Sequence, residues 1–495
     1  MKWLFGGELG FCAALIIGSV ISSAIFGNTI PMLQLNTLLT VSIICSCFAS
    51  SQALAQDTTA PHVADIENLP RNIIYLIGDG MGPAYTSAYR YYADDPNTKV
   101  VEKTIFDQLL VGVSSTYPDD DTYVTDSASS ATALATSHKT YNGAISVDHQ
   151  HNPLSTMLEI AKGQGKATAI VVTSQINHAT PASFLAHNES RRNYNAIADS
   201  YLSNLINGQP VADLMLGGGT EYFVREDKDL TKDFEQLGYQ YINNINRLNT
   251  LESLPALGLF APKGLPSALG SADPLRLTTM TRKALELLNN QEAPFVMMVE
   301  ASQIDWCGHS NDIACAMAEM HDFASTLQHV KAFIDANPDT LLVATADHST
   351  GGLTLGRDGV YQWKGELLHD VVSLPQVIAQ AIITDPNALD TSASFAAFLA
   401  QHIRFDIDPK NLDTLRLQLY SRFEQDKTAK LIKKDLLHFI DKATYTGWTT
   451  SGHTAIDVPI FAYGKGQQHF TGHKDNTEIG ANLIHIINAQ SEQIK

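Results

Sequence analysis

The chain has 495 residues, of which 44% are hydrophobic and 17% are charged, and its formal net charge at pH 7 is −19. This length is enough for one large domain, or for two or three smaller ones, with a substantial core. The acidic excess argues against a nucleic-acid partner and against binding to an anionic membrane surface.

The N-terminal region has the features of an export signal. Two apolar runs, at 11–26 and 38–48, precede the sequence Ala-Leu-Ala at 53–55, which fits the small-x-small rule for signal peptidase cleavage. We expect residues 1–55 to be a signal peptide or apolar leader. The mature protein would then be periplasmic or secreted, with no stable membrane partner. Met32 is an alternative start, and a retained membrane anchor is the competing interpretation.

Beyond this leader, strand-like and helix-like patterns alternate. Short apolar runs of strand length occur at 72–77, 167–172, 213–216, 295–299, 341–345 and 458–463. Apolar residues recur at threes and fours, as in helices, at 154–162, 195–205, 280–288 and 313–334. A strand that is apolar along its whole length is buried on both faces. The pattern therefore predicts an α/β fold with a central, mainly parallel sheet and helices on both of its faces.

The segment 124–133 has the sequence Val-Thr-Asp-Ser-Ala-Ser-Ser-Ala-Thr-Ala. We interpret it as a loop that delivers Ser127 to the first turn of a helix. The free backbone N–H groups and the dipole of that turn would hold a phosphate oxygen where Ser127 could attack the phosphorus. The alternative is that Asp126 or Ser127 is simply a helix cap.

Acidic and imidazole side chains follow nearly every predicted strand, where ligand sites of parallel sheets lie. They are Asp79, His178 with Thr180, Glu300, Asp305, His309, Asp347, His348 and His453. Buried carboxylates need partners, and a divalent metal is the natural one for so many. The mixture of nitrogen and oxygen ligands suits zinc. Two zinc ions about 4 Å apart can hold both oxygens of a phosphoryl displacement.

A phosphate site in so acidic a chain also needs local positive charge. The segment 187–192 supplies Arg191 and Arg192, and a guanidinium matches two phosphate oxygens. One of these two arginines is expected to be a surface residue. Two cysteines, Cys307 and Cys315, remain after cleavage of the leader, and they are either a disulfide or two buried thiols.

The segment 359–442 departs from the alternating pattern. It contains helix-like stretches at 374–383, 393–403, 415–423 and 431–439. We interpret it as an inserted subdomain that covers the site or forms a subunit interface. The catalytic domain would then comprise residues 56–358 and 443–495. The alternative is that this segment simply continues the main domain.

From about residue 71 to residue 470, apart from the insertion, the chain resembles the metal-dependent alkaline phosphatases. The matching motifs are 78–82, 124–133, 139–143, 298–300, 304–305, 345–348 and 451–454, in the family's order. The resemblance implies a homodimer that hydrolyses phosphate monoesters with two Zn²⁺ and one Mg²⁺.

The resemblance also implies a role for each candidate residue. Ser127 is the phosphorylated nucleophile, and Arg191, with Asp126 beside it, binds the phosphate. One zinc is held by Asp305, His309 and His453, and the second by Asp79, Asp347 and His348. The magnesium site is formed by Asp79, His178, Thr180 and Glu300.

Two positions depart from the enterobacterial members of this family. His178 stands where they have Asp, so zinc could replace magnesium there. Trp306 stands where other members have Lys or His, close to the expected phosphate, and it should alter phosphate release. Together with the insertion, these residues resemble the marine Vibrio type, in which the insertion forms a crown at the dimer interface.

Two other functions remain open from sequence alone. A phosphodiesterase can use the same metal scaffold, although such enzymes usually carry Thr at the position of Ser127. A secreted phosphate- or metal-binding protein is the alternative outside the enzymes, but it has no need of a nucleophile beside two complete sets of zinc ligands.

Overall fold

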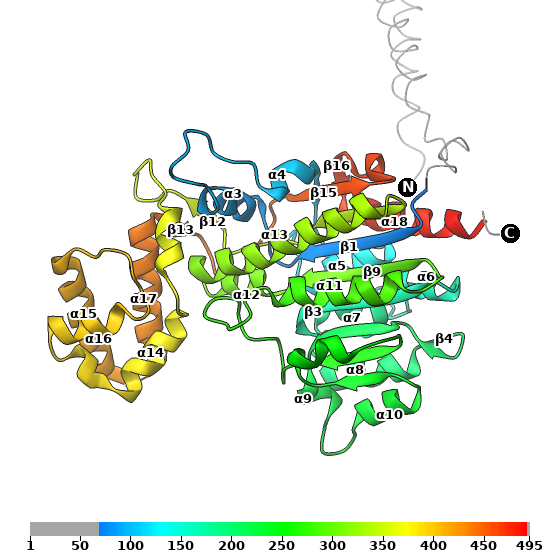
Figure 1. Cartoon of the computed structure of the whole chain (residues 1–495), viewed down its shortest axis with the longest axis horizontal. Helices are drawn as coiled ribbons and strands as arrows, with labels where there is room; N and C mark the ends of the chain where they lie inside the picture. Colours follow the sequence, from blue (N-terminus) through cyan, green and yellow to red (C-terminus); the bar gives the residue numbers. More distant parts are fainter. Residues whose placement is uncertain (1–68, 427, 493–495) are drawn as a thin grey trace, which may run out of the picture. The chain divides into compact units, whose positions relative to one another are not determined.

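The computed structural model describes residues 69–426 and 428–492. Its centre is a ten-stranded sheet, drawn in Figure 1. In spatial order the strands are β16 (Gly472–Asp475), β2 (Leu110–Ser115), β15 (Val458–Gly464), β10 (Thr340–Thr345), β1 (Asn72–Gly78), β9 (Phe295–Ala301), β3 (Ala167–Gln175), β6 (Leu214–Gly218), β8 (Ala256–Leu259) and β7 (Gln240–Ile242). In this sheet β15 alone runs antiparallel to its neighbours. The prediction of a mainly parallel α/β sheet is confirmed.

The central strands are buried on both faces because their alternate side chains enter two different cores. In β1, Ile74 and Leu76 belong to one apolar cluster, whereas Ile73, Tyr75 and Ile77 belong to the other. Helices α3 (Pro83–Tyr92), α11 (Arg276–Asn289) and α13 (Ile313–Ala336) pack on the first face. Helices α5 (Ser127–Thr136), α6 (Met157–Gly163), α7 (Ala179–Leu185) and α18 (Asn476–Glu492) cover the second.

The smaller elements connect this framework. The helices are α4 (Ile105–Leu109), α8 (Tyr194–Ser203), α9 (Thr220–Phe223), α10 (Leu230–Gln236) and α12 (Gln303–His309). The remaining short strands are β4 (Leu205–Ile206), β5 (Gln209–Pro210), β11 (Ser349–Thr350) and β14 (His453–Thr454). The 3₁₀ turns are η3 (Ile245–Thr250), η4 (Gly365–Asp370), η5 (Pro386–Leu389) and η6 (Gln467–Phe470). Strand β14 pairs with β11, which brings the late segment around residue 453 back to the end of β10.

Some predicted boundaries were wrong for local reasons. The helix expected at 154–162 begins at Met157, because Thr156 and Glu159 form a capping box that fixes its start. The helix expected at 280–288 begins at Arg276. Strands β2, β7, β8 and β16 were not predicted. Strand β2 is partly exposed, β7 and β8 have only three and four residues, and β16 is a short polar stretch at the edge of the sheet.

The segment predicted as an insertion is helical. It contains α14 (Pro375–Thr384), α15 (Ser392–Leu399), α16 (Pro409–Asp426) and α17 (Ala429–Thr444), which lie together in Figure 1. The antiparallel pair of β12 (Leu353–Leu355) and β13 (Thr446–Trp448) stands at the two ends of this segment. Buried residues of these helices, such as Ile378 and Leu436, belong to the same apolar cluster as α3 and α13.

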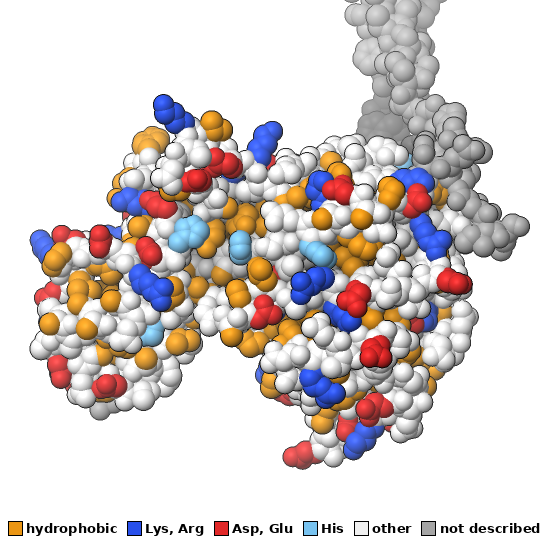
Figure 2. Space-filling view, in the orientation of Figure 1, with side chains coloured by type: hydrophobic (Ala, Val, Ile, Leu, Met, Phe, Trp, Pro, Cys, Tyr) orange, Lys and Arg blue, Asp and Glu red, His pale blue; other side chains and the backbone are white. Residues whose placement is uncertain are grey.

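The surface is mixed in character. Figure 2 shows acidic and basic side chains interspersed over one face, with apolar side chains also visible on the group formed by α14–α17. No helix in 69–426 or 428–492 has the length and apolar character needed to cross a bilayer. The predicted leader at 1–55 lies outside the described residues.

Asp441, in α17, makes the stability of this region depend on pH. Burial raises the pKa of Asp441 to about 7, against the opposing effects of its hydrogen bond from Trp448 and of the Arg357 charge. An ordinary aspartate has a pKa of about 3.9. The folded state therefore binds a proton that the unfolded state has lost, and this carboxyl destabilises the fold progressively as the pH rises from about 4 to 7.

We expect the substitution Asp441→Asn to remove this pH-dependent penalty. The melting temperature at pH 8 should rise by about 2 °C or more, with no gain at pH 4, because the asparagine oxygen can still accept the Trp448 hydrogen bond. Thermal melts of both proteins across this range test it, with the exposed Asp390→Asn as the matched control. An equal gain at both pH values would show that the charge on Asp441 is not the cause.

Candidate active site

Ser127 is the first residue of α5, as the loop-to-helix interpretation predicts. Asp126 is the N-cap of this helix, and its carboxylate accepts a hydrogen bond from the Ser129 backbone N–H at 3.0 Å. The capping alternative therefore also holds, for Asp126. The Ser127 side chain is buried, and its Oγ lies 3.1 Å from Nε2 of His348. The hydroxyl thus lies at a helix N-terminus and beside one of the predicted metal ligands.

The structure brings the predicted ligands together in three groups, in each of which the ligand atoms lie within 4.8 Å of one another. The groups are Asp305/His309/His453, Asp79/Asp347/His348 and Asp79/His178/Glu300. They are called here the first, second and third ligand groups. Asp79 follows β1 and belongs to both the second and the third group. These residues lie far apart in the sequence, and the ends of β1, β3, β9 and β10 gather most of them.

Several buried atoms of the second and third groups, and the hydroxyl of Thr180, have no hydrogen-bond partner among the described residues. They are both oxygens of Asp79, Oδ2 of Asp347, Oε1 of Glu300, Nδ1 of His178 and Oγ1 of Thr180. An unpaired buried polar atom is costly, and so many in one place require a ligand that satisfies them together. Carboxylate oxygens, an imidazole nitrogen and a hydroxyl are a donor set that fits divalent metal ions.

The charges of these groups also call for a cation. Burial raises the pKa of Asp347 and of Glu300 to about 7. Burial, and then the neighbouring carboxylates of Asp347 and Asp305, raise the pKa of Asp79 well above its ordinary value. Burial and the Arg191 charge lower the pKa of His178 to about 3, so that its ring is neutral and able to coordinate. A bound divalent cation would relieve the repulsion among the carboxylates.

In the first group, hydrogen bonds orient both histidines toward a common point. Nδ1 of His309 lies 2.6 Å from the carbonyl oxygen of Ser451, and Nδ1 of His453 lies 2.8 Å from that of Thr125. Since a carbonyl only accepts, each Nδ1 carries a proton, so Nε2 is the nitrogen of each ring that a metal could take. The two Nε2 atoms lie 3.1 Å apart. The hydrogen bond with Asp305 raises the pKa of His309 to about 9. In the metal-free protein the ring therefore carries a second proton on Nε2 near neutral pH, and a metal would have to displace it.

The structure distinguishes the two candidate arginines. Nη1 of Arg191 lies 2.9 Å from Oδ2 of Asp126, directly beside the start of α5. The Arg191 backbone N–H also donates to the carbonyl of Gly143, which fixes the loop that carries it. Arg192 is exposed. Arg191 is therefore the arginine that lies beside Ser127, and its role in binding phosphate stays a prediction.

Trp306 is half-buried and lies against the third group. Its ring meets that of His178 edge-on, with the ring centroids 5.9 Å apart. A Cβ atom at Gly264 would lie only 2.3 Å from Cη2 of Trp306, so the absence of a side chain there leaves room for the indole. The contacts with His178 and Gly264 place the indole beside the third group. Contact between Trp306 and bound phosphate stays a prediction.

Sequence reasoning missed the side chains that hold these residues in place. Thr350 Oγ1 donates to Asp305 at 2.5 Å, and Ser302 Oγ donates to Glu300 at 2.6 Å. Asn142 holds the residues on either side of the nucleophile. Its Oδ1 accepts from the Asp126 backbone N–H at 2.6 Å and from Ser129 Oγ at 3.0 Å. Asn142 lies in a segment that matches a family motif, but its role depends on contacts that only the folded chain creates.

We expect Asn142→Ala to lower kcat by roughly ten-fold or more, because a small misplacement of catalytic groups is costly. Loss of the amide frees the Asp126 backbone and the loop at 122–124, to which Nδ2 of Asn142 also donates. Steady-state kinetics with a phosphate monoester test this. The matched control is Asn152→Ala, in an exposed turn, where the amide bonds only to Asp148. Equal kinetics for both variants would show that Asn142 does not position the nucleophile.

Comparison with known proteins bears on what this geometry does. The family model described as alkaline phosphatase matches residues 70–489. The chain belongs to the alkaline phosphatase family. Alkaline phosphatase 3 of Bacillus subtilis is 44% identical over 418 residues, which cover 84% of this chain and 88% of that one. Alkaline phosphatase of Escherichia coli is 33% identical over 357 residues, covering 60% of this chain and 74% of that one.

A solved structure agrees with these relatives of the alkaline phosphatase family. The cold-active alkaline phosphatase of the psychrophile Shewanella sp. is 45% identical, with a TM-score of 0.77 over 84% of this chain and 99% of that one. The resemblance seen in the motifs is confirmed, and the chain is a metal-dependent phosphomonoester hydrolase. Its likeness to the Vibrio type stays a prediction.

Proposed function

We propose that this phosphatase works through a phosphoserine on Ser127, with one zinc ion in the first ligand group and another in the second. The observation that carries the proposal is the position of Ser127 Oγ at a helix N-terminus, 3.1 Å from His348 of the second group. When bound, metals in these groups would lower the pKa of the Ser127 hydroxyl and offset the negative charge on the leaving oxygen.

The proposed reaction consists of two successive displacements at phosphorus. In the first, Ser127 Oγ bonds to phosphorus, the bond to the ester oxygen breaks, and the alcohol leaves with a proton. In the second, a water oxygen bonds to phosphorus, the Ser127 Oγ–P bond breaks, Ser127 Oγ takes up a proton from the water, and inorganic phosphate is released. Arg191, oriented by its ion pair with Asp126, would hold two phosphate oxygens through both steps. The N–H groups in the first turn of α5 that Asp126 does not cap would face the same phosphate.

The third ligand group is proposed to hold Mg²⁺ or Zn²⁺. Glu300, Asp79 and Thr180 offer oxygen, which suits magnesium, whereas the imidazole of His178 suits zinc. Variants of the alkaline phosphatase from the Antarctic bacterium TAB5, in which a histidine is replaced by glutamate or aspartate, have Mg bound in a site named M3. That enzyme is 25% identical to this chain, with a TM-score of 0.62.

Assembly and location are proposed on the family resemblance and the sequence. The chain would be exported through the leader at 1–55 and would form a homodimer. The proposed subdomain at 359–442 is the candidate interface, because Val377 on α14 and Leu417 and Tyr420 on α16 are large apolar side chains exposed to solvent. The oligomeric state of a variant that lacks residues 365–442 can be measured by analytical ultracentrifugation. If this variant is still a folded dimer, the proposed interface is wrong.

Substrate choice and metal content together test the proposed function. Purified protein is assayed with p-nitrophenyl phosphate and with bis-p-nitrophenyl phosphate, and its zinc and magnesium are measured by mass spectrometry. The proposal predicts a strong preference for the monoester and about two zinc ions per chain. Preference for the diester would make the chain a phosphodiesterase on the same scaffold. Bound zinc without hydrolysis of either compound would favour the binding-protein alternative.

A further inference from the structure

Two ligands of the first group lie on a very short helix. Asp305 and His309 belong to α12, which has seven residues. A helix of this length is not stable in water by itself, so its neighbours must fix its position. The side chain of His309 is also 42% exposed, whereas that of Asp305 is 5% and that of His453 is 13% exposed. The first group therefore depends on whatever holds α12 in place.

A disulfide joins α12 to the helix that follows it. Cys307, midway between Asp305 and His309, is bonded to Cys315 in the first turn of α13, with their Cα atoms 5.5 Å apart. This resolves the alternative of disulfide or free thiols that the sequence left open. Cys307 is 1% and Cys315 is 8% exposed. Both sulfur atoms are shielded from reductants in solution, so the disulfide is a structural crosslink rather than a redox-sensitive bond.

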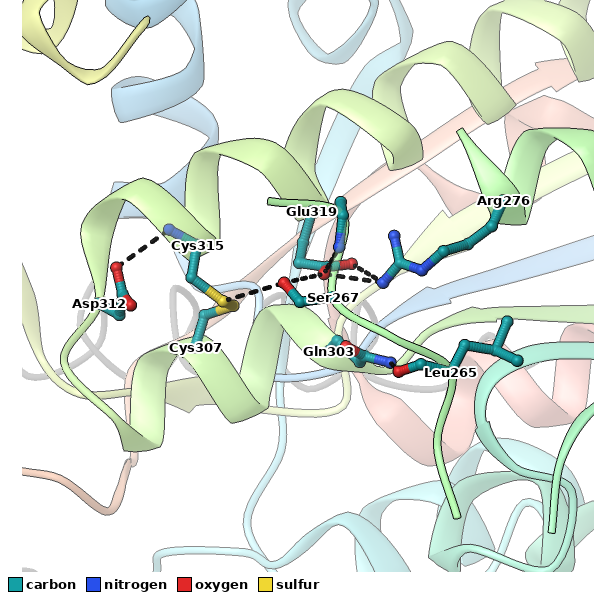
Figure 3. Close-up of a disulfide and its surroundings, with 9 residues drawn as sticks. Leu265, Ser267, Arg276, Gln303, Cys307, Asp312, Cys315 and Glu319 are labelled. Carbon is teal, nitrogen blue, oxygen red and sulfur yellow. Dashed lines mark hydrogen bonds and ion pairs between the residues drawn. A yellow bond between two sulfur atoms is a disulfide. The ribbon is translucent and has the colours of Figure 1, made fainter. Parts of the chain in front are cut away.

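A buried ion pair holds α13 to α11, and Figure 3 shows Arg276 facing Glu319 of α13. Arg276 of α11 reaches Glu319 of α13 at 2.7 Å and Asp322 at 3.4 Å, and all three side chains are at most 3% exposed. Ser267 links this ion pair to the disulfide, because its Oγ lies 3.2 Å from Glu319 and 3.7 Å from Cys315 Sγ. The disulfide thus connects α12 to a buried, ion-paired part of the core.

We propose that the Cys307–Cys315 disulfide preorganises α12 so that the first ligand group retains its metal, and that this metal alone is lost readily without the bond. The inference rests on the proposed function, since it assumes that the first group holds zinc. The second group supplies an internal comparison, because its three ligands are fully buried. They follow β1 and β10, and none of them lies on α12.

The test is the rate at which zinc leaves each group. Zinc-loaded wild type and the double variant Cys307→Ser/Cys315→Ser are mixed with excess 4-(2-pyridylazo)resorcinol, and the coloured zinc complex is followed with time. In the variant, one zinc per chain should be released at least about ten-fold faster, comparable to the loss of a residue that supports metal ligands. The remaining zinc should leave at the wild-type rate.

A matched control separates this effect from general destabilisation. Ile487→Ala opens a cavity in the core on the opposite face of the sheet, away from α12. It should leave the ratio of the zinc release rates as in wild type. If the serine variant does not fold, the variant Cys307→Ala/Cys315→Val replaces the two sulfur atoms with apolar groups of similar volume. Its zinc release is measured in the same way.

The outcomes separate this inference from the proposed function. Unchanged zinc release in the folded double variant, or equal acceleration of all the zinc ions, would overturn the role of the disulfide while the proposed metal groups stand. A wild-type protein that binds no zinc would instead overturn the proposed function on which the inference rests.

Discussion

Ser127→Ala is expected to lower kcat for p-nitrophenyl phosphate by on the order of 10³-fold or more, because removal of a catalytic nucleophile has effects of at least this size. Without Oγ, no covalent bond to phosphorus can form at this position. The metal content should not change, since all the His, Asp and Glu side chains of the three ligand groups are retained. Alanine is also well tolerated in the first turn of a helix whose cap, Asp126, is retained.

The measurement combines steady-state kinetics with zinc analysis of the same samples. Ser203→Ala is the matched control, because this serine is exposed and its hydroxyl contacts only a backbone carbonyl of α8. Retention of activity within about ten-fold of wild type in a fully metal-loaded Ser127→Ala variant would mean that water attacks the ester directly.

Asp79→Asn should have opposite effects on the metal-free and metal-loaded proteins. Asp79 is shared by two ligand groups, so its loss is expected to weaken metal binding at both by about 100-fold or more and to abolish most activity. In the metal-free protein, however, the same change removes a buried carboxylate that has no hydrogen-bond partner. It also ends the repulsion by Asp347, Asp305 and Glu300 that contributes to the raised pKa of Asp79.

Thermal melts with and without a chelator measure this reversal. The variant should melt above wild type when both are metal-free at pH 8, and below wild type when both are supplied with zinc and magnesium. Asp227→Asn, at an exposed carboxylate, is the matched control and should shift neither melt. A variant that keeps full metal content, or that melts below wild type in both states, would contradict the assignment of Asp79 as a shared ligand.

The central sheet and the residues at its edge could be predicted from the sequence for a simple reason. Strands such as β1 and β10 are apolar along their whole length because helices cover both of their faces. A polar residue directly after such a strand, such as Asp79 or Asp347, is then conspicuous. Parallel strands end at one edge of the sheet, so these residues meet there although more than 250 positions separate them.

The remaining features depend on contacts that local sequence does not encode. Strand β16 is polar and short, and it becomes a strand only because β2 offers it an edge. Arg191 and Arg192 are adjacent and chemically identical, and only the folded chain distinguishes them, through the Asp126 ion pair and the exposure of Arg192. Asn142 is of a residue type that is common in turns, and its role follows only from the fold, which brings its side chain to the Asp126 backbone N–H. Neither cysteine spacing nor composition decided whether Cys307 and Cys315 were bonded.

The most direct test of the account is to trap the covalent intermediate. Enzyme turning over p-nitrophenyl phosphate is quenched with acid within milliseconds, digested, and examined by mass spectrometry for a peptide carrying one added phosphate. The phosphoserine mechanism predicts one phosphate on Ser127. It also predicts an initial burst of p-nitrophenol under conditions where dephosphorylation limits the rate. Phosphate on a different residue, or steady turnover with no phosphorylated peptide and no burst, would contradict it.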